Sequence, residues 1–429
     1  FFVRDPETKF IYKQSSGEYL LVSCTATGLE NEALTFVPAT HHLNYGSAVR
    51  RFEAFVTFAA VSLMLLSCLV PIYLFGRDAQ NPLGPLTSVF GTMLTACALA
   101  FSRRYLHGEF MFGRFVMLMA GLSTGFSLVA TAPTLTHVLP GWEVISFCST
   151  FLIGAYNDRP SACENATFAF ALYKLSGFAL LVAVTFSSQP GYEALVALGL
   201  IMAALTNSSQ FPFTSLFMRS MEGPSPTSAL GCAGLSAHVG VVMLSNTMPL
   251  WFGFAWARSI VVMVGIITTV FSGLVGKVRA DRNGAIASAT SSTLGLIYVI
   301  LAAGYPNTAL VLSLGHAAFR MLQFLRAANF VLDMRNMRSA LRDELKPKAM
   351  PEWVYQLCWV LNRINVDSQT PLMLQMLTGH RRMLGLRLSK YQQWLATGVL
   401  LILAGVPFTP VSSYISMAIT DLLNSHPLW

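Results

Sequence analysis

The chain has 429 residues, of which 54% are hydrophobic and only 11% charged, whereas about a quarter of the residues of a soluble domain are charged. This composition excludes an ordinary soluble domain and indicates a protein embedded in a membrane. The formal net charge of +8 lies mostly in basic runs between apolar stretches, such as Arg50-Arg51 and Arg103-Arg104. That distribution is typical of loops that orient membrane helices, and no nucleic-acid partner is expected.

Residues 1–45 are mixed and polar, and we expect them to form an N-terminal extension outside the membrane. Because the chain starts at Phe1 rather than Met, we also expect that a targeting segment was removed or lies outside this sequence. The seven cysteines include no Cys-x-x-Cys pair, which argues against a disulfide framework, a zinc site or an iron–sulfur centre. There is no Gly-x-Gly-x-x-Gly turn either, so we expect neither a cofactor nor a metal.

Long uncharged stretches follow the extension, and a helix of about 20 residues is enough to cross the hydrocarbon core of a bilayer. We therefore expect an all-α, polytopic transmembrane helix bundle of about 10–12 spans. Their length excludes transmembrane β-strands, which give a short, alternating pattern. The uncharged stretches lie at 54–76, 84–101, 115–142, 144–157, 165–191, 194–218, 227–247, 259–276, 284–319 and 391–420.

A single carboxylate, Glu143, interrupts this apolar sequence. Residues 115–142 and 144–157 contain no Asp, Glu, Lys or Arg. Holding a charge inside a bilayer costs at least a few kcal/mol, so a carboxylate kept there is by default a proton or ion site. The alternative is that Glu143 lies near a membrane end, where headgroups solvate it.

Two apolar segments contain prolines where a simple span would not tolerate them. Proline removes a backbone donor and prevents regular helix, and broken helices at membrane depth typically line polar cavities at transport sites. We expect helix breaks within 201–230 and 396–418, the latter in a discontinuous C-terminal transmembrane helix over 391–429. For two of the prolines, Pro224 and Pro226, a loop between spans is an equal alternative. The broken-helix candidates are Pro212, Pro224, Pro226, Pro407 and Pro410.

Residues 334–390 are more polar and basic than the rest of the chain, with amphipathic stretches at 334–345 and 353–364. An amphipathic helix of this kind usually lies on a surface, with its apolar side against lipid or a neighbouring helix. We therefore expect an extramembrane or interfacial insertion here.

Several motifs resemble those of one family and occur in that family's order between about residues 84 and 415. The most specific is the run from Met221 through Glu222-Gly223-Pro224, similar to the family's MEGP. The chain resembles the subunit-5 type antiporter-like membrane subunit of respiratory complex I (NADH:ubiquinone oxidoreductase), which is related to Mrp-type antiporter subunits. The Glu-Gly-Pro form favours the complex I subunit, because the Mrp type usually reads Glu-Ala-Pro. The other matching segments are 141–143, 147–154, 159–162, 168–174, 209–212, 316–320, 381–387 and 403–407.

The resemblance implies an antiporter-like transmembrane core, which we assign to residues 46–333. It also implies a non-catalytic subunit of a proton-translocating NADH:ubiquinone oxidoreductase, with the lipid bilayer and other membrane-arm subunits as partners. The family's C-terminal part, with its last spans and a long lateral helix, has no counterpart after Trp429. We expect that this part was lost or that a separate chain supplies the missing C-terminal helices.

The family moves protons with a glutamate–lysine pair and further lysines and histidines, and this chain keeps only some of them. The proton-path candidates that the resemblance gives are Glu143, Lys174, His316 and Arg320. The positions at which a family lysine or histidine is lost are Asn207, Cys232 and Ile415. A further histidine, His238, matches none in the family, and we expect it to be structural.

A proton relay needs groups that gain and lose charge. Asn207 cannot carry a charge, and Arg320 cannot release its proton at any accessible pH. We therefore expect a retained fold with an interrupted proton path. We also expect Glu143 to face the protein interior, within hydrogen-bond or water-bridge reach of Lys174 or of the Asn207 region.

Three functions remain open on the sequence. The chain is expected to be a membrane-arm subunit of complex I; the alternatives are a free-standing or Mrp-like cation/proton antiporter subunit and a purely structural antiporter-like remnant. We expect it in the mitochondrial inner membrane, with a bacterial plasma membrane as the alternative.

Overall fold

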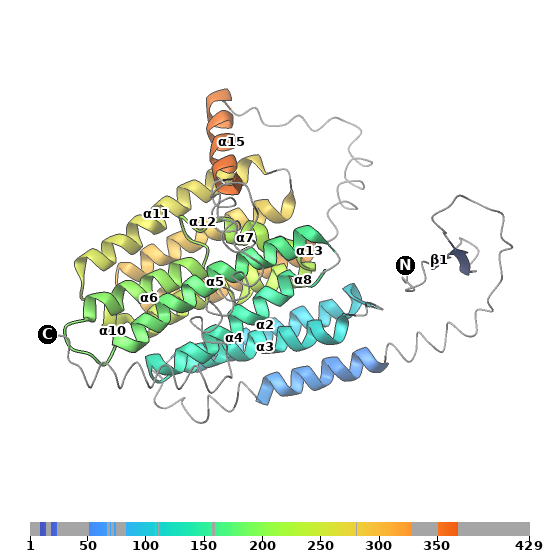
Figure 1. Cartoon of the computed structure of the whole chain (residues 1–429), viewed down its shortest axis with the longest axis horizontal. Coiled ribbons are helices and arrows are strands. Elements are labelled where there is room, and N and C mark those ends of the chain that lie inside the picture. The colour runs from blue at the N-terminus through green and yellow to red at the C-terminus, as the bar shows by residue number, and fades with distance from the viewer. Residues whose placement is uncertain are drawn as a thin grey trace, which may run out of the picture.

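The computed structural model of the chain describes residues 9–13, 19–23, 51–66, 83–107, 111–156, 159–279, 281–327 and 351–367, together with single residues 69, 73 and 109. Helices make up most of these ranges and lie side by side in a bundle (Figure 1). The only strands in the described residues, β1 (Lys9–Lys13) and β2 (Tyr19–Ser23), pair antiparallel, with Lys9 opposite Ser23. The expected helical bundle is confirmed, and the expected N-terminal extension contains a hairpin.

Among the described residues, six helices are long and apolar enough to cross a membrane. They account for six of the about 10–12 expected spans. Apolar side chains of one of them, α11, are more than half exposed, with Met263 at 57% and Val270 at 56%, which suits a surface in contact with lipid. The six are α2 (Gly84–Tyr105), α3 (Phe112–Thr131), α5 (Pro160–Phe186), α11 (Ala255–Val278), α12 (Arg282–Ala302) and α13 (Pro306–Ala327).

Shorter helices complete the described part of the bundle. Residues 51–66 are helical and precede α2. The remaining elements are α4 (Leu135–Ile153), α6 (Glu193–Asn207), α7 (Ser215–Arg219), the 3₁₀ turn η1 (Ser220–Glu222), α8 (Ser225–Ser228), the π-helical η2 (Ala229–Gly234), α9 (Val239–Asn246), α10 (Met248–Trp251) and α15 (Glu352–Asp367).

Close helix pairs are built on glycines. A Cβ on Gly125 of α3 would lie 2.8 Å from the carbonyl oxygen of Gly141 on α4, and a Cβ on Gly141 would lie 2.7 Å from the carbonyl oxygen of Gly125. The backbones of α3 and α4 therefore touch at a point where only glycine fits, as is common between membrane helices. Since Gly141 is two residues before Glu143, this contact fixes the position of α4 beside the carboxylate.

The first predicted helix break is present. Helix α6 ends at Asn207 and the next helix begins only at Ser215. Pro212 lies in the irregular segment between them, where Ser209 adopts a left-handed backbone with φ of 52°. Ser208, Ser209 and Gln210 are fully buried, as irregular backbone must be where no water can satisfy it.

The prolines that follow this break begin a helix. Pro224 is the N-cap of α8 and Pro226 lies in its first turn, where a missing N–H costs nothing. Helix α8 runs directly into η2. The expected break within 396–418, with Pro407, Pro410 and the segment 391–429, lies outside the described residues.

The amphipathic stretch 353–364 falls within α15. This helix packs against α11 and α7, and the hydroxyl of Thr214, in the break after α6, donates a hydrogen bond of 2.7 Å to Asn365 Oδ1. On the same helix, Trp353 is 70% exposed. The stretch 334–345 and the rest of 334–390 lie outside the described residues.

Candidate functional site

Glu143 and Lys174 form a buried ion pair. Lys174 Nζ, on α5, donates a hydrogen bond to Glu143 Oε2, on α4, and the two side chains are only 14% and 6% exposed. The structure thus brings together two charged residues that lie 31 positions apart in the sequence. Such a pair is held by mutual attraction in a low-dielectric interior, and either partner alone would be a costly unpaired charge.

Two neighbours on α5 set the position of the Glu143 carboxylate. Gly177 lies one turn after Lys174, and its missing side chain leaves the space that Glu143 Oε1 occupies. Ser176 accepts a hydrogen bond of 3.1 Å from the indole of Trp142 and donates one of 2.8 Å to the carbonyl oxygen of Ala203 on α6. The site is therefore tied to three helices. Sequence reasoning missed Gly177 and Ser176, although the i,i+3 spacing of Gly177 to Lys174 is a signal that it shares that face.

Asn207 stands at the last position of α6 and is fully buried. Neither its amide nitrogen nor its amide oxygen has a hydrogen-bond partner among the described residues. No hydrogen bond connects it to Glu143 within that part of the chain. The break beside it is held by neutral groups, since the hydroxyl of Tyr298 donates to Ser208 Oγ over 2.8 Å and Ser209 Oγ donates to the carbonyl oxygen of Phe213 over 3.0 Å.

A second polar cluster lies across α9, α12 and α13, and it contains the other two proton-path candidates. His316 Nδ1 is 3.0 Å from Nε2 of His238, and Arg320 Nε donates to His316 Nε2 over 3.2 Å. The hydroxyl of Thr293 also contacts His316 Nε2. The structure therefore joins His316 to His238, although no sequence pattern connects these two residues. The one signal available was a lone histidine in an apolar segment.

The positions at which a family lysine or histidine is lost lie in different parts of the chain. Cys232 is in the π-helical η2, next to the turn that leads to His238. A π-helical turn leaves backbone groups out of the regular ladder and is frequent at functional sites. Ile415 lies outside the described residues.

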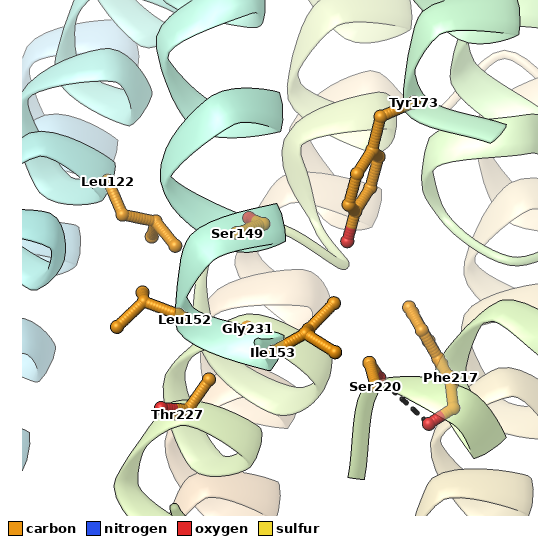
Figure 2. A pocket seen from close by; sticks show the side chains of 9 residues that line it. All are labelled: Leu122, Ser149, Leu152, Ile153, Tyr173, Phe217, Ser220, Thr227 and Gly231. Atoms are coloured by element: carbon orange, nitrogen blue, oxygen red, sulfur yellow. Dashed lines mark hydrogen bonds between the residues drawn. The ribbon is translucent and has the colours of Figure 1, made fainter. Parts of the chain in front are cut away.

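A small cavity lies at the end of α4. Tyr173, which precedes Lys174, points into it together with Ser149, Ser220 and Thr227 (Figure 2). Its volume of about 10 Å³ is near the minimum that admits one water molecule. The hydroxyl of Ser220 donates to the carbonyl oxygen of Phe217 over 2.8 Å, shown dashed in Figure 2.

A larger polar pocket of about 420 Å³ opens where the ends of α2 and α4 and the starts of α5 and α12 meet α7, η1 and α8. Glu222, one of the two carboxylates that line it, accepts hydrogen bonds from Asn165 over 3.4 Å and from Ser161 over 3.5 Å. Burial raises the pKa of Tyr156 in the wall of this pocket. The Glu-Gly-Pro motif therefore borders the pocket.

These groups differ in what they can do with a proton. The Glu143–Lys174 pair can exchange one between its two members. The break at Asn207 offers amide and hydroxyl groups, which order water but do not change charge. Arg320 is a permanent cation.

Comparisons with known proteins agree with this arrangement. Residues 132–401, more than half of the chain, match the family described as NADH:quinone oxidoreductase/Mrp antiporter, transmembrane region. The chain is 27% identical over 288 residues to NAD(P)H-quinone oxidoreductase subunit 5, chloroplastic, from Nuphar advena. It is 28% identical over 265 residues to NADH-ubiquinone oxidoreductase chain 5 from Locusta migratoria. These alignments cover 61% and 58% of this chain but 39% and 46% of the relatives, so the chain spans less than half of their length.

Solved structures share the fold. The chain superimposes on a chain of the Mrp complex from Dietzia sp. with a TM-score of 0.56 at 17% identity, covering 91% of this chain and 56% of that one. A chain of the membrane-bound sulfane sulfur reductase, an archaeal respiratory membrane complex, gives a TM-score of 0.52 at 13% identity, covering 88% and 98%. The expected antiporter-like fold is confirmed. With the family match over residues 132–401, the chain belongs to the NADH:quinone oxidoreductase/Mrp antiporter transmembrane family.

Proposed function

We propose that the chain is a membrane-arm subunit of NADH:ubiquinone oxidoreductase whose own proton path is interrupted at Asn207. The observation that carries the proposal is the buried Glu143–Lys174 pair together with a helix break after α6 that holds no charged group in the described residues. A proton leaving the pair would next need a titratable acceptor in the break, and Asn207 is not one. The subunit-5 relatives and the Glu-Gly-Pro motif favour the complex I subunit.

Assembly is tested first. A tag on this chain should purify NADH:ubiquinone oxidoreductase activity and the other membrane-arm subunits from the native membrane. The same preparation shows whether a second polypeptide with the C-terminal part of the relatives accompanies it. Recovery of the chain as a monomer, away from NADH oxidation, would overturn the proposal.

Proton transport is tested with Glu143→Gln in the assembled complex, by counting protons moved per NADH oxidised in sealed vesicles. An interrupted path predicts an unchanged ratio, since the carboxylate no longer hands its proton on. Glu193→Gln is the matched control, because Glu193 is a carboxylate at the exposed start of α6. A lower ratio in Glu143→Gln alone, with assembly intact, would show that this subunit still pumps.

An Mrp-like cation/proton antiporter is the second candidate, and the structural likeness to the Dietzia Mrp complex favours it. It predicts sodium-dependent proton movement in vesicles that contain the chain without NADH. The third candidate, a structural remnant, predicts that complex assembly needs the chain while no variant of Glu143 or Lys174 changes the proton ratio.

The proposed location is the mitochondrial inner membrane, with a bacterial plasma membrane as the alternative. The core over 46–333, the interfacial insertion over 334–390 and the discontinuous helix over 391–429 belong to the same proposal. Protease accessibility of intact organelles on both sides of the membrane tests the location and the insertion together.

A further inference from the structure

The histidine–arginine cluster has a chain of contacts with two chemically different ends. At one end, Arg320 Nε–H points at His316 Nε2 over 3.2 Å. His316 Nδ1 then lies 3.0 Å from His238 Nε2, and His238 Nδ1 lies 2.7 Å from the carbonyl oxygen of Gly234 at the end of η2. These contacts therefore run from the guanidinium of Arg320 to the carbonyl oxygen of Gly234 through the two imidazole rings.

We propose that Arg320 and the Gly234 carbonyl fix His316 and His238 as neutral imidazoles with their protons on Nδ1, so that this cluster is a lock that cannot relay protons. Arg320 is then a positioning residue for both rings. The inference deepens the proposed interruption of the proton path, because it places a second stop beyond Asn207.

The two ends determine the tautomers. A guanidinium only donates hydrogen bonds, so the atom that faces it, His316 Nε2, must present a lone pair. The proton of neutral His316 is therefore on Nδ1, where it can only be donated to His238 Nε2. His238 Nε2 in turn presents a lone pair, and its own proton lies on Nδ1 and is donated to Gly234 O, which only accepts. Each of these contacts is a hydrogen bond when the donors point in one direction, from Arg320 through the two rings toward Gly234.

A relay would have to pass through the opposite direction. When a proton hops along a chain of imidazoles, each ring is left with its proton on the other nitrogen. Here that state would put a proton on His316 Nε2, against the N–H of Arg320, and a lone pair on His238 Nδ1, against the oxygen of Gly234. The contact of His316 with Arg320 and the contact of His238 with Gly234 would then both be repulsive. The hydrogen bonds through the two rings therefore cannot reverse their direction.

Protonation of a ring is opposed as well. An imidazolium at His316 would lie beside the fixed charge of Arg320, and like charges at this separation disfavour each other strongly away from water. Helix α13 and the elements that pack against it, which are α2, α8, η2, α9 and α12, contain no Asp or Glu. On these elements no carboxylate is available to stabilise a second positive charge. The hydroxyl of Thr293 also contacts His316 Nε2, and it donates its own proton to the carbonyl oxygen of Ala289 over 2.8 Å.

Arginine suits this role because its fork makes three directed contacts at once. Nη1 donates to Gln323 Oε1 over 2.8 Å and Nη2 donates to the carbonyl oxygen of Ala289 over 3.1 Å, while Nε faces His316. The guanidinium is thus held by both α12 and α13 and keeps its charge. A lysine could lose its proton and then accept one, which would open the end of the chain.

The test is ¹⁵N solid-state NMR of the full chain in lipid vesicles with its eight histidines labelled. The His316→Gln and His238→Gln variants assign the two rings by loss of signal. We expect both wild-type rings to stay neutral with protonated Nδ1 from pH 5 to pH 8. An imidazolium at either position in that range, or a proton on His316 Nε2, overturns the proposal, and this result needs no measurement of pumping.

Variants separate positioning from packing. Arg320→Met removes the donor, and we expect His316 to change tautomer or titrate within this pH range, while Arg320→Lys restores a donor and returns part of the wild-type pattern. Arg326→Met, at an exposed position further along α13, is the matched control and should leave both rings unchanged.

If Arg320→Met does not fold, His238→Gln still decides, because His316 should keep its Nδ1 proton when Arg320 is present. An unchanged His316 spectrum in a folded Arg320→Met variant contradicts the proposal. Proton counts with Glu143→Gln do not enter this measurement, so the two proposals fail independently.

Discussion

Gly177 lies against the carboxylate of Glu143 so closely that any side chain at this position would overlap Oε1. It is one turn from Lys174 on α5, so the same helix face supplies both the cation and the space for the anion. The ion pair therefore depends on a residue that carries no charge, and the geometry of the pair can be tested without touching either charged group.

The first prediction concerns this space. Gly177→Ala should push the carboxylate away from Lys174 and destabilise the subunit by about 1–3 kcal/mol, as expected for overpacking of a buried site. Thermal denaturation of the purified complex measures the change. Gly113→Ala is the matched control, because its Cβ would meet nothing within 4 Å and alanine favours the helix. Equal melting curves for the two variants would show that α4 and α5 can separate without cost.

The second prediction addresses the energy of the pair itself. Lys174→Met leaves a buried carboxylate without a partner, which costs about 3–5 kcal/mol, whereas the double variant Glu143→Gln/Lys174→Met removes both charges and should recover most of that loss. Complex abundance and denaturation of the single and double variants form a double-mutant cycle. Simple additivity of the two single variants would mean that the two side chains do not interact in the membrane.

How much of this site the sequence predicts depends on how local each signal is. Glu143 stands out because a charge inside a long apolar run is rare, and Lys174 was found through a matching motif. The break near Pro212 was predicted from the proline alone, since its effect on the backbone is local. By contrast, Pro224 and Pro226 could equally mark a loop or a break, and in the structure they start α8.

Contacts between distant segments could not be predicted from one sequence. His238 and His316 are separated by 78 residues, and Thr214 and Asn365 by 151, so no periodic pattern connects them. The π-helical turn of η2 also leaves no mark in local propensity, because it differs from an α-helix by a single shift in hydrogen bonding. The directional hydrogen-bond chain at Arg320 therefore appears only once the fold is known.

The third prediction concerns the contact between the break and α15. Thr214→Val removes the hydroxyl that donates to Asn365 and leaves a buried amide oxygen without that donor, at a cost of about 1–3 kcal/mol. We expect faster amide hydrogen exchange in α15 and in the segment from Ser208 to Thr214. Thr167→Val is the control, because among the described residues its hydroxyl bonds only to the carbonyl oxygen of Cys163, in its own helix turn. Exchange that speeds up equally in both variants would rule out a specific link between α15 and the break.

The last prediction returns to Asn207. Its side chain is fully buried, and neither amide atom has a hydrogen-bond partner in the described part of the chain. If the proton path stops here, Asn207→Leu should leave the protons moved per NADH unchanged, because it removes no group that changes charge. The same substitution should keep or raise stability, since leucine is similar in size and buries no polar atoms. Asn207→Lys is the complementary variant: it adds a titratable group at the end of α6, and the proton ratio then reports whether a cation alone reopens the path. A lower ratio in a stable Asn207→Leu complex would mean that the amide orders water for a working path, and the proposed interruption would be wrong.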